Sequence, residues 1–102
     1  MKTQLKHIIQ NHKGRANPIT GRELAYFLKQ NDDRKIRLII RELISEGMPI
    51  ASTTESPAGY FLVESYAEAR DYAESVKSRL INDAIRRRDF RRAADMSLQG
   101  SV

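Results

Sequence analysis

The sequence contains no cysteine and no tryptophan. Without cysteine the chain can form neither a disulfide nor a thiolate metal site, and a reducing compartment suits it. No apolar run approaches the roughly 18 residues that a membrane helix needs. The first residues also lack the apolar stretch of a secretory signal. These absences predict a cytoplasmic protein that does not associate with a membrane.

Catalytic and cofactor-binding patterns are missing as well. The glycines form neither a dinucleotide fingerprint nor a P-loop, and no serine lies in a Gly-x-Ser-x-Gly turn. His7 and His12 do not share a helix face, and neither has an acidic neighbour at metal-ligand spacing. Asp32 and Asp33 precede a helix, where capping explains them better than catalysis. We expect a protein that is not an enzyme and has no cofactor, metal or evident small-molecule ligand.

Positive charge is what the chain has in excess. Its 102 residues include 18 Lys and Arg against 13 Asp and Glu, a formal net charge of +5. The excess is uneven, because residues 1–47 carry ten basic and five acidic side chains whereas residues 48–102 carry eight of each. A chain of this length forms one small domain, and a polyanion is the first partner to consider.

Hydrophobic spacing predicts two short helices near the N-terminus. The first covers about residues 3–11, with Gly14 as its stop, and buries Leu5, Ile8 and Ile9. The second begins at Thr20, which forms a capping box with Glu23. Its expected buried side chains are Leu24, Phe27 and Leu28.

A third helix is predicted from Asn31 or Asp32, as its cap, to about Glu46, with Gly47 as its stop. At 100° per residue, one side of it carries the expected core residues Ile36, Ile39, Ile40, Leu43 and Ile44. The opposite side carries Arg34, Arg37 and Arg41 within a narrow arc, and Glu42 and Glu46 lie on a separate flank. Such segregation of charge is either an ordinary solvated face or a surface for an anionic partner.

The remaining chain predicts a β-hairpin and a long helix. Two apolar runs, residues 48–52 and 60–63, flank a polar tip that contains Glu55, Pro57 and Gly59. The helix opens at Ser65 in a second capping box with Glu68, and continues to about Ala94. We expect residues 95–102 to be a disordered tail.

The order of these elements is that of a winged helix. The segment RELISEGMPIASTTESPAGYFL resembles the end of the winged helix-turn-helix domain at the N-terminus of biotin operon repressors and related bacterial regulators. The matching residues are Leu43, Gly47, Pro49, Ile50, Gly59, Tyr60 and Leu62, and in the second helix Glu23, Leu24, Ala25 and Leu28. The architecture is also similar to small winged-helix proteins of phages and prophages. The expected fold is mainly α with a small β-hairpin: a winged helix-turn-helix domain at residues 1–63, followed by a long helix at residues 64–94.

This resemblance implies binding to double-stranded DNA, with the third helix in the major groove. The expected contacts on that helix are Arg34, Lys35, Arg37, Leu38 and Arg41, and on the wing Ser52, Thr53 and Thr54. A second basic cluster near the end of the last helix would bind phosphates through Arg86, Arg87, Arg88, Arg91 and Arg92. A homodimer through that helix is a further option. Transcriptional control and a role in phage or plasmid replication both remain open.

Two functions other than duplex binding are also compatible with the sequence to different degrees. The domain could instead serve as a protein-interaction module whose arginines dock an acidic partner, and Glu55 in the wing favours this. Binding of single-stranded nucleic acid or RNA is disfavoured, because the chain lacks tryptophan and regularly spaced aromatic residues on which bases could stack.

Overall fold

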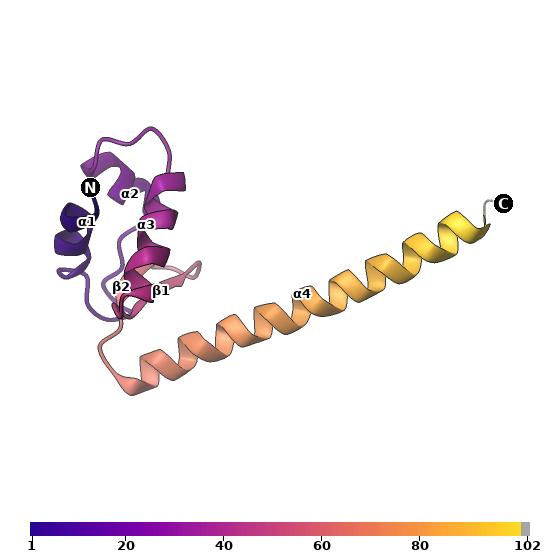
Figure 1. Cartoon of the computed structure of the whole chain (residues 1–102). Coiled ribbons are helices and arrows are strands. Elements are labelled where there is room, and N and C mark those ends of the chain that lie inside the picture. The colour runs from indigo at the N-terminus through magenta and orange to yellow at the C-terminus, as the bar shows by residue number, and fades with distance from the viewer. Residues whose placement is uncertain (101–102) are drawn as a thin grey trace. The chain divides into compact units, whose positions relative to one another are not determined.

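The computed structural model describes residues 1–100 and divides into two units, Met1–Tyr72 and a second that begins at Ala73. The first unit contains three helices, a hairpin and the start of a fourth helix. The rest of that fourth helix belongs to the second unit (Figure 1). The elements are α1 Lys2–Ile9, α2 Gly21–Phe27, α3 Arg34–Ser45, β1 Ile50–Thr53, β2 Gly59–Leu62 and α4 Tyr66–Gly100. The protein is therefore mainly helical with a small hairpin and a long last helix, as predicted.

The core of the first unit lies between α1, α2, α3 and the hairpin. Its fully buried side chains include Leu5, Ile19, Leu24 and Ile36. Two predicted core residues are wrong, because Phe27 is 58% exposed and Ile44 is 44% exposed. In α2 the small side chain of Ala25 is buried instead. The core is thus narrower on both helices than the apolar pattern suggested.

Local signals fix both ends of α2. The Thr20 side chain accepts a hydrogen bond from the Glu23 amide, and the Glu23 carboxylate accepts one from the Thr20 amide, which confirms the predicted capping box. At the other end Lys29 has a left-handed φ of 56°, and the Gln30 amide donates to the Ala25 carbonyl at 2.8 Å. These bonds form a Schellman ending with lysine in the position that glycine usually takes.

The cap of α3 lies one or two residues later than the predicted caps, Asn31 or Asp32. Asp33 is the cap residue and makes no side-chain capping bond, whereas Asp32 accepts from the Arg34 amide at 3.1 Å. The predicted stop is confirmed. Gly47 has a φ of 105°, and the Met48 amide donates to the Leu43 carbonyl at 3.0 Å.

Strands β1 and β2 pair antiparallel, with Ile50 opposite Leu62 and Ser52 opposite Tyr60. The chain before α2 extends this pairing, because Ile19 bridges Tyr60 through two backbone hydrogen bonds of 2.7 and 2.8 Å. The hairpin is thereby fixed to the chain segment that caps α2.

Helix α4 departs from prediction at both ends. Glu68 accepts from the amide of Glu64 rather than completing a box with Ser65, although the Ser65 hydroxyl does accept from the Glu68 amide at 3.2 Å. The predicted disordered tail is wrong from residue 95 to Gly100, where α4 is still helical. Met96, Leu98 and Gln99 in this stretch are good helix formers, which explains the extension. Residues 101 and 102 lie outside the described residues.

Candidate nucleic-acid interface

The exposed surface of α3 carries the five residues predicted to contact DNA. All five side chains are exposed: Arg34, Lys35, Arg37, Leu38 and Arg41. Helical geometry places Arg34, Arg37, Leu38 and Arg41 on the side opposite the buried Ile36 and Leu43. Leu38 is 56% exposed and lies at the edge of this face, beside the arginines.

The cations on this face are not equally free. The Arg37 guanidinium lies 3.5 Å from the Asp33 carboxylate, four residues earlier. Both side chains are about half exposed or more, so the pair is weak, about 0–1 kcal/mol, and can be displaced. Arg34 and Arg41 form no ion pair within residues 1–100. The face therefore keeps a net positive charge.

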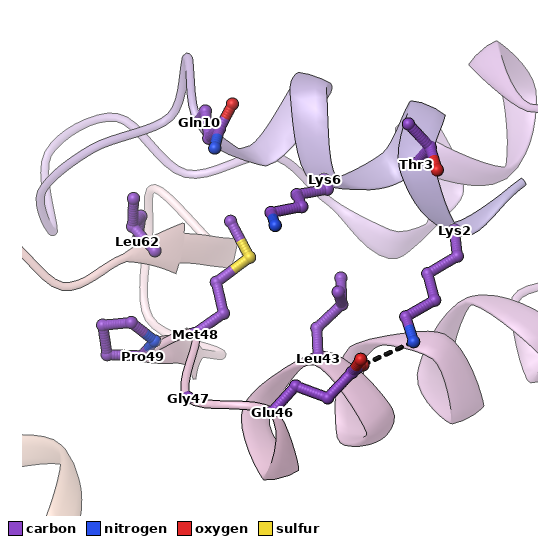
Figure 2. A pocket seen from close by; sticks show the side chains of 10 residues that line it. All are labelled: Lys2, Thr3, Lys6, Gln10, Leu43, Glu46, Gly47, Met48, Pro49 and Leu62. Carbon is purple, nitrogen blue, oxygen red and sulfur yellow. Dashed lines mark ion pairs between the residues drawn. The ribbon is translucent and has the colours of Figure 1, made fainter.

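The acidic residues of α3 face α1 instead. Lys2 contacts both the Glu42 carboxylate, at 3.1 Å, and the Glu46 carboxylate. Figure 2 shows Lys2 and Glu46 pointing toward one another across the end of an open pocket of 610 Å³. The two carboxylates raise the pKa of Lys2, with Glu46 the larger cause. The two signs of charge on α3 therefore have different surroundings: Glu42 and Glu46 contact Lys2 of α1, whereas the arginines face solvent.

The floor of that pocket is apolar and its wall is basic. Leu43, Met48 and Leu62 lie at the floor, while Lys6 extends from α1 toward Met48 (Figure 2). The pocket separates α1 from the turn between α3 and β1. It explains why Met48 is only partly buried beside the core.

The predicted wing contacts are only partly available. Ser52 and Thr53 are half-buried, and Thr54 is exposed. The Thr53 hydroxyl accepts from the Glu55 amide at 3.1 Å, so it helps to shape the tip of the hairpin. Thr54 is the member of this group that is free to meet a partner.

Arg15 is the residue of this region that sequence reasoning missed. Its guanidinium donates to the Pro57 carbonyl at 2.8 Å and to the Glu55 carbonyl at 3.0 Å. The loop between α1 and α2 thereby brings a cation to a hairpin tip that has none of its own. A separation of 40 and 42 residues leaves no local pattern from which this contact could be predicted.

Glu68 fixes the loop that carries Arg15. Its carboxylate accepts from the Arg15 amide at 2.9 Å and from the Glu64 amide at 2.9 Å. These two bonds, the one from Arg15 first, lower the pKa of Glu68. The neighbouring residue in the loop, Gly14, has a φ of 87°, and a Cβ there would lie 2.7 Å from the Glu64 carboxylate. The first turn of α4, the loop and the hairpin tip are therefore joined at Arg15.

The second predicted basic cluster lies on α4, in the second unit. Its five members are all exposed: Arg86, Arg87, Arg88, Arg91 and Arg92. The helical repeat groups all of them except Arg86 on one side of α4. Arg88 also pairs with Asp89 at 3.2 Å. This face offers four guanidinium groups within two turns of helix.

Two aromatic side chains of α2 are unexpectedly exposed. Tyr26 is 78% exposed and Phe27 is 58% exposed, and their rings meet edge to face with centroids 5.7 Å apart. Adjacent exposed aromatic residues are uncommon on a surface that contacts only water, and they are enriched where proteins bind one another.

Comparison with known proteins gives no relative: no family model, curated protein or solved structure matches the chain. Among residues 1–100, no helix is long and apolar enough to cross a membrane.

Proposed function

We propose that this chain is a winged-helix protein that binds double-stranded DNA through α3. The observation that carries the proposal is the sorting of charge on that helix: Arg34, Arg37 and Arg41 face solvent, while Glu42 and Glu46 face Lys2. Three helices followed by a hairpin, in this order, also suit a winged helix. Nucleic acid is the polyanion whose groove admits a helix of this width.

In this proposal α3 enters the major groove. Arginine there can donate two hydrogen bonds to guanine O6 and N7, or can bind phosphate, and Lys35 lies close enough to the helix start to reach the backbone. Leu38 is placed to touch a thymine methyl group. The weak Asp33 contact would be exchanged for DNA by Arg37, at little cost because both side chains are exposed.

The remaining parts would add affinity without base contacts. Thr54 of the hairpin and the arginines of α4 would meet phosphates. Exposed Leu80, Ile81 and Ile85 on α4 suit a homodimer through that helix. We place the protein in the cytoplasm, acting in transcription or in phage or plasmid replication rather than as an enzyme.

The test is fluorescence anisotropy of a labelled random-sequence duplex, repeated across a salt series. For the parent protein we expect the logarithm of affinity to fall steeply with the logarithm of salt, with a slope of roughly −4 or steeper. Replacing Arg37 and Arg41 with alanine should weaken binding by roughly tenfold or more, because each arginine contact is worth about 1–3 kcal/mol. The helical circular dichroism spectrum should not change.

Arg41→Ala made alone is compared with Lys6→Ala, its matched control. Lys6→Ala also removes one exposed cation, but from α1 beside the pocket and away from the α3 face. We expect it to leave the affinity close to that of the parent. Equal losses for Lys6→Ala and Arg41→Ala would reduce the interaction to net charge, and no binding by the parent at low salt would end the DNA proposal.

The second candidate function is a protein-interaction module with an acidic partner. The Tyr26–Phe27 pair favours it, because exposed aromatic side chains often anchor protein interfaces. Replacing both with alanine should not affect duplex binding if α3 is the DNA contact. A loss of duplex affinity as large as that of the arginine variant would instead place α2 in the same interface.

A further inference from the structure

The tip of the hairpin has a charge that its own sequence does not explain. Residues 48–63 contain no Lys or Arg, and their one ionisable acid is Glu55. Taken alone, this segment would repel the phosphates that a wing approaches. The structure changes that expectation, because the guanidinium of Arg15 lies at the tip and bonds to the carbonyls of Glu55 and Pro57.

We infer that Arg15 is the phosphate-binding cation of the hairpin tip, supplied by the loop between α1 and α2. This rests on the proposed DNA function and adds a residue to it. A guanidinium carries five N–H donors, and the two carbonyl contacts occupy two of them. The remaining donors and the full positive charge are available to a phosphate.

Two features keep this charge from being cancelled. Within the described residues no carboxylate lies within ion-pair distance of the Arg15 guanidinium, and the Glu55 contact is to its carbonyl rather than to its side chain. The side chain is also half-exposed, so its outer edge can be reached from solvent. Arg15 is therefore positioned but not neutralised.

The positioning extends beyond the guanidinium. The Arg15 amide donates to Glu68 at 2.9 Å, which fixes the backbone from which the side chain extends. Gly14 brings the loop close to Glu64 and Glu68, where a side chain would meet the Glu64 carboxylate at 2.7 Å. A cation held by both its backbone and its side chain loses little conformational freedom when it binds phosphate, which favours affinity.

The experiment compares Arg15→Gln, Arg15→Lys and Lys6→Gln in the salt series of duplex binding. Glutamine removes the charge, and we expect the slope of log affinity against log salt to become shallower by about 0.9, the value for one released phosphate contact. Lysine keeps the charge but cannot bond both carbonyls as a planar fork, so the slope should match that of the parent. Lys6→Gln removes a cation from α1 and should also leave the slope unchanged.

A merely structural Arg15 would give another pattern. It would loosen the tip in both variants, visible as faster exchange of the amide protons of residues 53–56, 58 and 59, while the slope stayed that of the parent. Either an unchanged slope for Arg15→Gln or an equal loss for Arg15→Lys overturns the inference. Failure of the parent to bind duplex would instead overturn the proposed function, so the two failures are distinguishable.

Discussion

Replacement of Gly59 by alanine tests how the hairpin is attached to α2. Gly59 has a φ of 137°, a conformation that L-residues rarely adopt. A Cβ at this position would lie 2.5 Å from the Ile19 carbonyl oxygen and 2.9 Å from the Thr20 nitrogen. These are backbone atoms, so no side chain can rotate away to relieve the contact. The hairpin and the segment that caps α2 must therefore move apart.

The loss of stability in Gly59→Ala has two contributions, one from backbone conformation and one from broken hydrogen bonds. The unfavourable backbone conformation costs roughly 1–2 kcal/mol. Separation of the two segments would also break the two backbone hydrogen bonds between Ile19 and Tyr60, each worth about 1 kcal/mol net. We expect Gly59→Ala to lower the unfolding free energy of the first unit by about 3–4 kcal/mol. That is a large share of the roughly 5–15 kcal/mol typical of a folded domain.

Gly47→Ala is the matched control, because it separates the conformational cost from the clash. Gly47 also has a positive φ, of 105°, but a Cβ there would have nothing within 4 Å. Only the backbone term applies, so this variant should lose about 1–2 kcal/mol. Native-state hydrogen exchange of the amide of Ile40, a buried residue inside α3, measures both values within the first unit, without a contribution from α4 beyond Tyr72. Equal losses for the two variants would refute the argument from the close approach at Ile19.

Two further predictions follow from Glu68 and from the α4 arginines. The lowered pKa of Glu68 means that the unfolded chain takes up its proton at a higher pH than the folded one. The stability of the first unit should therefore fall as the pH drops below about 4.5 toward the folded pKa, and Glu68→Gln should reduce that dependence in an acid titration followed by circular dichroism. On α4, Arg87→Gln with Arg91→Gln should make the salt slope of duplex binding shallower by about 2 if both bind phosphate. An unchanged slope in anisotropy would exclude phosphate binding by these two arginines.

The parts of the fold that could be predicted are those fixed by neighbouring residues. The capping box of Thr20 and Glu23 spans four residues, and the stop at Gly47 depends on one φ angle, so both are visible in the sequence. The hairpin follows from two apolar runs around a polar tip. The exposure of Arg34, Arg37 and Arg41 also follows from helical period alone, once the core side of α3 is known.

The parts that could not be predicted depend on which elements pack together. Phe27 and Ile44 are apolar at helical spacing, yet no neighbouring element covers either side chain fully. A helix of seven residues, as in α2, offers too few turns for periodicity to distinguish a buried phenylalanine from a buried alanine. Arg15 was missed for the same reason, because its partners lie 40 and 42 residues away.

The acidic and basic side chains of α3 differ in the contacts that they make within the fold. Glu42 and Glu46 have a partner within the fold, because both contact Lys2 of α1 in exposed ion pairs. The fold does not use Arg34 or Arg41, which make no ion pair in the described chain, and Arg37 and Arg41 stand at a like-charge spacing that costs a helix a few tenths of a kcal/mol. Glutamine at these positions would remove that cost and keep the face soluble. Within the described chain these arginines make one weak, exposed ion pair, and Arg37 and Arg41 repel each other, so the proposal of an outside partner, a polyanion with a groove, rests on them. If glutamine at Arg37 and Arg41 leaves the fold as stable as the parent or more so while duplex affinity is lost, function and not stability accounts for the arginines.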